Sequence, residues 1–304
     1  MESDSAAPTS SPRRKSLESG ARAKIIDGNA IATRIRALLA HRITKLWQLH
    51  GLRPALAVIR VGDNPASAIY VNNKIKACAA VGVHSVNIEL PSDTSTAALL
   101  EIVERFNADP AIHGILVQLP LPQKIDMRQV LEKISVRKDV DGFHLYNVGG
   151  LIVGDMAFPP CTPYGVVKLL ESEGIPIRGE NVVVVGASNI VGKPMGLMLL
   201  QQGATVSICH AGTRDLGQYT IMADILIVAA GRPRLIVPSM VRTGAVIIDV
   251  GINRLADGSI TGDVEFEGVS TKASRITPVP GGVGPMTVTM LLENTVVAAE
   301  RSLT

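Results

Sequence analysis

From Ile25 onward, helical segments alternate with short, continuous apolar segments, and this alternation constrains the fold more than any other feature of the sequence. The first series has predicted helices at 29–49, 66–80 and 97–107 and predicted strands at 55–61, 85–90 and 113–119. Short apolar strands separated by helices are typical of a parallel sheet that is covered on both faces. The sequence therefore predicts an α/β fold.

A second alternating series follows residues 138–163, where Gly, Pro and Asp interrupt the pattern and predict a linker or functional loop. Its predicted helices lie at 163–173 and 193–202, and its predicted strands at 182–185, 205–209, 225–229 and 245–250. A Gly- and Pro-rich stretch at 277–284 leads into a closing helix at 286–301. With 304 residues, 46% of them hydrophobic, the chain is long enough for two such units with full-sized cores.

Composition excludes several classes of protein. The net charge is +3, and residues 1–24 carry +2 of it, so no extended basic patch for nucleic acid or a membrane surface is expected. The longest apolar runs are far shorter than the roughly 18 residues of a transmembrane helix. The three cysteines lie far apart and the six histidines lack metal-ligand spacing, so neither a disulfide framework nor a metal site is indicated. These features favour a cytoplasmic protein.

Residues 1–23 are rich in Ser, Ala, Pro and Arg and show no hydrophobic periodicity. Ordering such a segment costs conformational entropy with little apolar burial in return, so a disordered tail is predicted. An organelle transit peptide is the alternative, and three acidic residues within so short a stretch count against it.

A dinucleotide site is suggested where the apolar strand 182–185 runs into Gly186-Ala187-Ser188 and then reaches Gly192 at the start of a helix. Glycines let the backbone approach a pyrophosphate, and the free amides of a helix N-terminus bind the anion. The spacing is G-x-S-x-x-x-G rather than G-x-G-x-x-G, and an ordinary strand-to-helix turn is the other interpretation.

The first unit contains candidate catalytic groups. Tyr70 and Lys74 are four residues apart on one predicted helix and share a face. The phenol is suited to stacking on an aromatic substrate, and a partly buried ammonium is suited to moving a proton, although a surface Tyr beside a solvated Lys is the alternative. Gln118 ends an apolar strand, at the sheet edge where ligands bind, unless it merely caps its own loop.

Two further segments are candidates for the site. In Lys138-Asp139-Val140-Asp141-Gly142, at most one of the two carboxylates faces a site if the segment is extended. Such a carboxylate anchors the two donors of a heterocycle edge, and a solvated turn is the alternative. The stretch 277–287 is too rich in Pro and Gly for a strand or helix interior, which suggests a loop shaped around a ligand.

Six motifs together resemble the bifunctional methylenetetrahydrofolate dehydrogenase/methenyltetrahydrofolate cyclohydrolase family, over the chain from about Lys24 to its C-terminus. In order, these motifs are Tyr70-x-x-x-Lys74, Val117-Gln118-Leu119-Pro120-Leu121-Pro122, Lys138-Asp139-Val140-Asp141-Gly142, Gly186-x-Ser188-x-x-Val191-Gly192-x-Pro194, Asp249-Val250-Gly251-Ile252-Asn253 and Pro278-Val279-Pro280-Gly281-Gly282-Val283-Gly284-Pro285-Met286-Thr287.

The resemblance implies a parallel-sheet, folate-binding catalytic domain at 24–161 and 286–304, and a Rossmann-type NADP-binding domain at 162–285. It also implies a homodimer that acts on tetrahydrofolate derivatives. The expected enzyme oxidises 5,10-methylenetetrahydrofolate to the methenyl form and then hydrolyses that product to 10-formyltetrahydrofolate. Both steps are expected in one pocket.

Carried over by position, the resemblance implies a role for each candidate. Lys74 is the catalytic proton mover, Gln118 hydrogen-bonds it, Tyr70 stacks on the folate and Asp141 holds the pterin edge, and these four form the expected catalytic set. Pro278 and Gly282 line the substrate pocket. The cofactor contacts are Gly186, Ala187, Ser188 and Ile252.

Two other classes of protein share part of this pattern. A short-chain dehydrogenase also has Tyr-x-x-x-Lys, but its glycine motif precedes that pair, whereas here Tyr70 precedes Gly186. A non-catalytic folate- or nucleotide-binding module would not need Lys74 and Gln118 together.

The expected cofactor is NADP. An NAD site usually places an acidic residue about 20 residues past the first glycine, and none occurs between Gly186 and Arg214. Some family members carry Arg at the position of Ala187 and Ser or Arg at that of Ala211 to contact the 2′-phosphate, and this chain has neither. Arg214 is the nearest replacement, with His210 and Lys193 adding polar or positive character.

Overall fold

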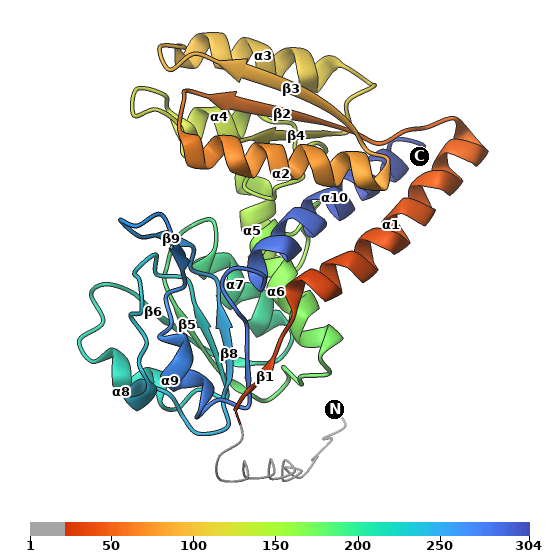
Figure 1. The fold of residues 1–304 in the computed structure, drawn as a ribbon. Helices are drawn as coiled ribbons and strands as arrows, with labels where there is room; N and C mark the ends of the chain where they lie inside the picture. Colours follow the sequence, from red (N-terminus) through yellow and green to blue (C-terminus); the bar gives the residue numbers. More distant parts are fainter. Residues whose placement is uncertain (1–21) are drawn as a thin grey trace, which may run out of the picture.

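In the computed structural model, which describes residues 22–304, two parallel sheets are joined by long helices (Figure 1). The smaller sheet has the strand order β3–β2–β4, with β2 at Ala55–Val61, β3 at His84–Leu90 and β4 at Gly114–Val117. The helices of this half are α1 (Gly28–His50), α2 (Pro65–Val81), α3 (Thr96–Ala108) and α4 (Met127–Lys133).

The larger sheet has six strands in the order β1–β11–β8–β7–β5–β6, and all its pairings are parallel. These strands are β1 (Lys24–Ile25), β5 (Asn181–Val185), β6 (Thr205–Cys209), β7 (Ile225–Val228), β8 (Val246–Asp249) and β11 (Arg275–Ile276). The surrounding helices are α5 (Leu145–Val153), α6 (Cys161–Ser172), α7 (Gly192–Gln201), α8 (Leu216–Thr220), α9 (Phe266–Ser270), a short 3-10 turn at Pro238–Met240 and α10 (Val283–Arg301). An antiparallel hairpin, β9 (Asn253–Arg254) and β10 (Ile260–Thr261), follows β8.

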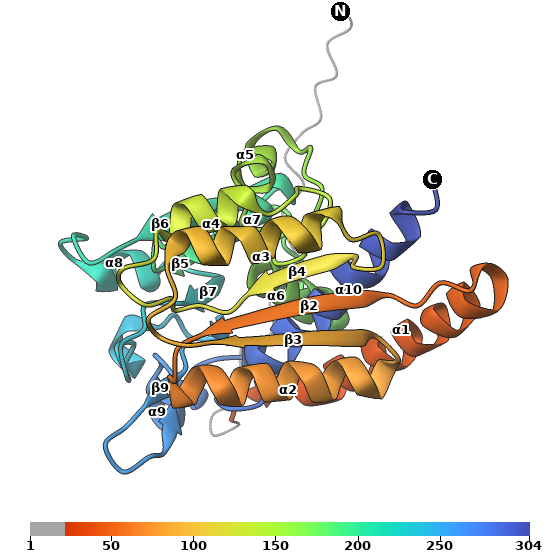
Figure 2. The ribbon, with the colours of Figure 1, turned by 90° about the horizontal axis from the view of Figure 1, so that it is seen from above.

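Both faces of the smaller sheet are covered by helices, as the alternating pattern predicts. Figure 2 shows α2 on one side of this sheet and α3 with α4 on the other. Along β2, Leu56 and Val58 join the buried cluster on the α1, α2 and α10 side, whereas Ala57 and Ile59 join the cluster on the α3 and α4 side. Side chains therefore alternate in direction, and both directions are apolar because both faces are buried.

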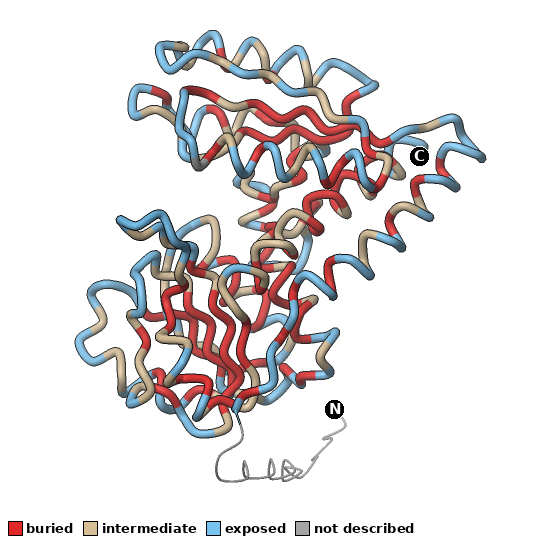
Figure 3. The backbone as a smooth tube through the Cα atoms, in the orientation of Figure 1, coloured by how far each residue is buried: buried red, intermediate tan, exposed pale blue. Residues whose placement is uncertain are grey.

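Helices α1 and α10 lie side by side and connect the two sheets (Figure 1). α10 also packs on α6, and buried residues of these helices belong to one hydrophobic cluster that reaches both sheets. Figure 3 shows the buried backbone continuing from the strands of each sheet into α10. The two halves therefore share one core.

The structure corrects several predicted segments. Residues 138–163 are not a continuous loop, because α5 lies at Leu145–Val153 and α6 begins at Cys161. α5 contains Gly149 and Gly150, which obscured its pattern, and it buries Asn147 and Leu151 against its surroundings. The sequence pattern also did not predict helix α4 at Met127–Lys133.

The N-terminal boundary differs as well. Most of the predicted tail, residues 1–21, lies outside the described residues. Ala23, however, is buried and donates its N–H to the Ser270 carbonyl at 2.7 Å, so the tail prediction is wrong there. Strand β1 follows at once and pairs with β11 of the larger sheet, although the sequence grouped residue 24 with the folate-binding domain.

Candidate active site

Helix α2 carries Tyr70 and Lys74 on successive turns of one face. Its first turn is held by Asn64, whose side-chain oxygen accepts the Ser67 N–H at 3.2 Å. Lys74 is partly buried, so it is not the solvated surface lysine of the alternative interpretation.

Gln118 is the first residue after β4, and its N–H still donates to the Ile59 carbonyl of β2 at 2.8 Å. Its side-chain Nε2 donates to the Leu119 carbonyl at 2.6 Å, which leaves Oε1 to accept from Lys74 Nζ at 2.9 Å. The amide thus holds the end of Lys74 in place and offers it only an acceptor.

Of the two carboxylates in the segment 138–142, Asp141 is the one that interacts with Lys74. Asp139 is buried away from the site, where it accepts the His144 N–H at 2.8 Å and Asn147 Nδ2 at 2.7 Å. The helix α10 residue Asn294 donates to the Val140 carbonyl between them at 2.8 Å. Asp139 and Asn294 therefore fix the backbone, and Asp141 is left for the site.

We call Lys74, Gln118 and Asp141 the Lys74 cluster. Burial and the neighbouring charge shift the pKa values of its two ionisable groups in opposite directions. Burial lowers the pKa of Lys74, and the neighbouring Asp141 partly reverses that effect. Burial raises the pKa of Asp141, and Lys74 opposes that shift. A lysine of lowered pKa gives up its proton more readily than a solvated lysine, which suits it to proton transfer.

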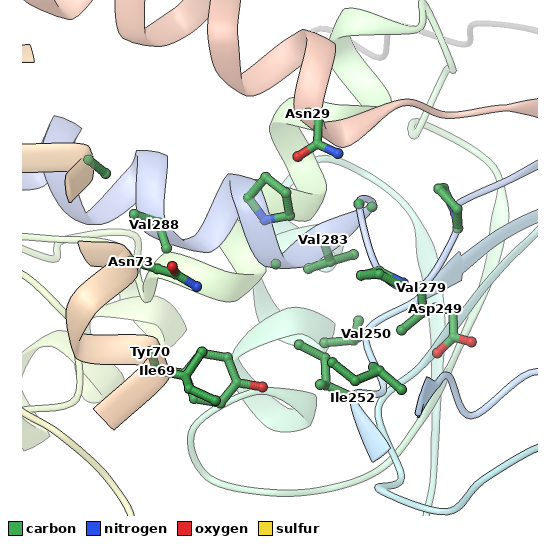
Figure 4. A pocket seen from close by; sticks show the side chains of 18 of the residues that line it. Asn29, Ile69, Tyr70, Asn73, Asp249, Val250, Ile252, Val279, Val283 and Val288 are labelled. Carbon is green, nitrogen blue, oxygen red and sulfur yellow. The ribbon is translucent and has the colours of Figure 1, made fainter. Parts of the chain in front are cut away.

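Beside this cluster lies a cavity of about 720 Å³ (Figure 4). Four predicted site residues line it, namely Tyr70, Ile252, Pro278 and Gly282. Figure 4 shows the Tyr70 ring extending toward Ile252, so the cavity has an aromatic group on one side and an aliphatic group opposite. Burial raises the pKa of the Tyr70 phenol, with Arg254 opposing that shift.

The Pro- and Gly-rich loop forms one wall of the cavity and packs tightly against the start of α1. Asn29 donates its N–H to the Gly281 carbonyl at 3.1 Å. A Cβ added to Gly28 would lie 1.8 Å from the Gly282 carbonyl oxygen, so only glycine fits there. This close packing supports the predicted ligand-shaped loop over a flexible linker.

The turn after β5 is closely packed through its glycines. Gly186 has φ +122°, and a Cβ there would lie 2.1 Å from the Ala229 carbonyl oxygen. A Cβ on Gly192 would lie 1.9 Å from the Gly186 oxygen, so the turn and the α7 N-terminus touch backbone to backbone. Ser188 Oγ accepts the Val191 N–H at 3.1 Å. This glycine-lined cradle leads from a strand into a helix N-terminus, the arrangement that binds a pyrophosphate in Rossmann-type folds.

Comparison with known proteins identifies the family. The tetrahydrofolate dehydrogenase/cyclohydrolase catalytic domain matches residues 26–141, and the NAD(P)-binding domain of the same family matches residues 160–303. The bifunctional protein FolD of Nitrosospira multiformis is 58% identical over 280 residues, which cover 92% of this chain and 97% of that protein. The chain belongs to the tetrahydrofolate dehydrogenase/cyclohydrolase family. The resemblance predicted from the six motifs is confirmed.

Solved structures of the tetrahydrofolate dehydrogenase/cyclohydrolase family share this fold. The bifunctional enzyme from Campylobacter jejuni has a TM-score of 0.89 and 51% identity, covering 91% of this chain and 99% of that one. The enzyme from Trypanosoma brucei, solved with NADP cofactor and an inhibitor, has a TM-score of 0.91 and 39% identity, covering 93% and 99%. The predicted α/β fold with parallel sheets is confirmed.

The predicted site residues of this family member fall into four groups. Tyr70, Ile252, Pro278 and Gly282 line the cavity, and the Lys74 cluster lies beside it without lining it. Gly186, Ala187 and Ser188 form the turn after β5. Arg214 is exposed after the neighbouring strand β6, and it has no hydrogen-bond or ion-pair partner among residues 22–304.

The sequence did not single out several residues that line the cavity. Asn73, Lys76 and Arg254 line it, and the only hint was that Asn73 and Lys76 share a helix with Lys74. Asp249 also lines the cavity, and it belongs to a motif that served only to show the family resemblance. Burial raises the pKa of Asp249 to about 6.

Within the described part of the chain, no group of three or more His, Cys, Asp or Glu side chains is placed to hold a metal ion. None of the helices at 22–304 is long and apolar enough to cross a membrane.

Proposed function

We propose that the chain carries out both reactions of its family at the Lys74 cluster and the adjoining cavity. It oxidises 5,10-methylenetetrahydrofolate to 5,10-methenyltetrahydrofolate with NADP, and then hydrolyses that product to 10-formyltetrahydrofolate. The observation that supports this most strongly is the hydrogen bond between Lys74 and Gln118, with Asp141 beside them. A binding module would need no partly buried lysine of lowered pKa there.

The substrate contacts follow from the chemistry of the lining groups. Tyr70 offers an aromatic face for the folate ring system, opposite Ile252. Pro278 and Gly282 shape the wall of the pocket. Asp141 accepts hydrogen bonds from the amino-pyrimidine edge of the pterin, for which two adjacent donors match one carboxylate.

Hydrolysis requires that an attacking water lose a proton. Gln118 Oε1 only accepts from Lys74 Nζ, so the lone pair of a neutral Lys74 stays available to that water. Burial favours the neutral amine by lowering its pKa, while Asp141 restores part of its basicity. Lys74 is thus the group that accepts and returns the proton, and Gln118 positions it.

The cradle after β5 would hold the dinucleotide through Gly186, Ala187 and Ser188, with Ile252 at its folate end. NADP supplies the hydride acceptor when bound. The protein's part is to bind it at the α7 N-terminus and to leave Ile252 facing Tyr70 across the shared pocket.

The two activities are tested together by adding purified protein to 5,10-methylenetetrahydrofolate with NADP or NAD. Absorbance of the reduced dinucleotide reports oxidation, and formation of 10-formyltetrahydrofolate reports hydrolysis. We expect both products, with NADP preferred. No change in absorbance with either dinucleotide would favour a non-catalytic binding module.

We expect Arg214→Ala to raise the KM for NADP about tenfold and to leave the KM for NAD unchanged. Arg214 is an exposed guanidinium in the loop after β6, beside β5 and its glycine turn, and a charge-assisted bond to the 2′-phosphate accounts for such a difference. Arg178→Ala is the matched control, because Arg178 is also exposed but precedes β5. Equal changes in both KM values would show that Arg214 does not contact the phosphate.

We expect Asp141→Asn to move the acid limb of the cyclohydrolase kcat profile to lower pH. The negative charge of Asp141 raises the pKa of Lys74, so removing that charge lowers the pKa and keeps the amine neutral in more acidic solution. The profile is measured at saturating 5,10-methenyltetrahydrofolate, with the exposed Asp155→Asn as control. A shift toward higher pH would contradict the assignment of that limb to Lys74.

The family resemblance also implies a homodimer, and we include it in the proposed function. Exposed apolar side chains on the contacting helices α5 and α7 support a protein contact there: Ile152, Val153 and Leu200 are 72%, 79% and 56% exposed.

A cytoplasmic location and the absence of a nucleic-acid partner remain predictions from composition.

A further inference from the structure

Two carboxylates, Asp249 and Asp263, are buried next to each other where β8 ends. Asp249 is 4% exposed and Asp263 is fully buried. The Asp263 N–H donates to Asp249 Oδ1 at 3.0 Å, and neither carboxylate forms an ion pair within residues 22–304. Burying two carboxylates without a cation is costly, so their hydrogen bonds must compensate.

Asp263 joins two segments that are distant in sequence. Its Oδ2 accepts the Ala230 and Gly231 N–H groups at 2.6 and 2.8 Å, just after β7. Its Oδ1 accepts Asn253 Nδ2 at 2.7 Å, at the start of β9. One carboxylate therefore connects the end of β7 to the hairpin.

The segment after β7 touches the proposed dinucleotide turn. A Cβ on Gly186 would lie 2.1 Å from the Ala229 carbonyl oxygen, so residue 229 is in direct contact with that glycine. Ala230 and Gly231, which Asp263 holds, continue this segment. Any movement of their amides moves the backbone against which Gly186 is packed.

Asp249 holds the other segment. It accepts the Gly251 N–H at 2.9 Å and the Val264 N–H at 2.9 Å. A Cβ on Gly251 would lie 2.3 Å from Asp263 Oδ1, so the two carboxylates enclose this turn. Ile252, between Gly251 and Asn253, is thereby fixed at the cavity, where it faces Tyr70 (Figure 4).

We propose that Asp263, supported by Asp249, is a positioning residue for the oxidation step, because it couples the backbone beside Gly186 to Ile252 in the pocket. This inference rests on the proposed function. The hydrolytic groups Lys74 and Gln118 lie on helix α2 and after strand β4 of the other sheet, and they hydrogen-bond to each other. Asp263 therefore acts on dinucleotide binding and oxidation, and it holds neither of the groups proposed to move the proton in hydrolysis.

The test exploits the fact that hydrolysis can be assayed without a dinucleotide, by supplying 5,10-methenyltetrahydrofolate. In Asp263→Asn, an NH2 group replaces one carboxylate oxygen. At least one of the three N–H groups that donate to Asp263 then faces another donor and loses its hydrogen bond. We expect the Kd for NADP, measured by calorimetry without folate, to rise about tenfold or more, and the KM for NADP to rise with it. Cyclohydrolase kcat, measured at saturating 5,10-methenyltetrahydrofolate, should stay within about twofold of the wild type.

The matched control is Asp257→Asn, the same change at an exposed carboxylate in the same hairpin, for which no effect on either quantity is expected. If Asp263→Asn does not fold, Asn253→Ala removes only the hairpin contact and should raise the NADP Kd by a smaller factor, about threefold. Parallel loss of both activities with a lower Tm would show that Asp263 is merely structural, and an unchanged NADP Kd would overturn the proposal. A wild-type protein without NADP-dependent oxidation would instead contradict the proposed function.

Discussion

Lys74→Met is expected to lower cyclohydrolase activity by about 10²- to 10⁴-fold, the range that general acid–base groups contribute. Methionine has similar length and fills the partly buried position beside Gln118, but it has no proton to exchange. Dinucleotide binding should persist, because the cradle after β5 lies on the other sheet. The measurement is the hydrolysis rate of 5,10-methenyltetrahydrofolate together with the Kd for NADP.

The control for this prediction is Lys45→Met, which makes the same change at an exposed position of α1 and should leave hydrolysis unaltered. Full cyclohydrolase activity in Lys74→Met would remove Lys74 from the mechanism. Loss of NADP binding together with hydrolysis would point instead to damage of the shared core.

The second large effect is expected for folate affinity in Asp141→Ala. Truncating one partner of a desolvated charged pair typically costs about 2 to 5 kcal/mol, which corresponds to a rise of roughly 30- to several thousand-fold in the folate Kd. Asp141 is suited to such an effect because it is desolvated, as its raised pKa indicates, so its removal leaves the two donors of the pterin edge without an acceptor. Its backbone should stay in place, because Asn294 and Asp139 hold the segment independently.

Folate binding is measured directly by titration, and NADP binding serves as the internal reference, which should be nearly unchanged. Asp155→Ala tests the same truncation at an exposed carboxylate of the following segment. Wild-type folate affinity in Asp141→Ala would show that Asp141 is only a structural residue of the turn and does not bind folate.

The long helices and central strands could be predicted because their signal is local. The apolar repeats of 29–49 and 55–61 match α1 and β2 to within one residue at each end, since the buried faces recur within each segment. Strands β1 and β11 have two residues each and exist through pairing with one another and with β8. Two residues carry no periodicity, so no pattern could reveal them.

The candidate site also contains residues whose placement could be predicted from the sequence and residues whose placement could not. The pair Tyr70 and Lys74 could be predicted because helical spacing puts both on one face. Spacing alone left the choice between Asp139 and Asp141 open, and only the family resemblance assigned Asp141. In the structure, Asp139 is held by Asn147 and by the N–H of His144, which belong to helix α5 and its N-cap, and the glycines of α5 hid that helix in the sequence. The Asp249 and Asp263 pair was also out of reach, because a hairpin separates its members in sequence.

The course of α10 has a consequence for biosynthesis. Helix α10, at Val283–Arg301, follows both sheets in the sequence, yet it completes the shared core by packing on α1 and contacting β2 and β4 of the sheet made first. During translation, apolar residues of that first sheet such as Leu56 and Leu116 have α1 and α2 beside them but lack the cover of α10 until residues 283–301 have been made. Folding of the N-terminal half by itself cannot supply that cover. The first sheet therefore reaches its native packing only after the second sheet and α10 have been synthesised.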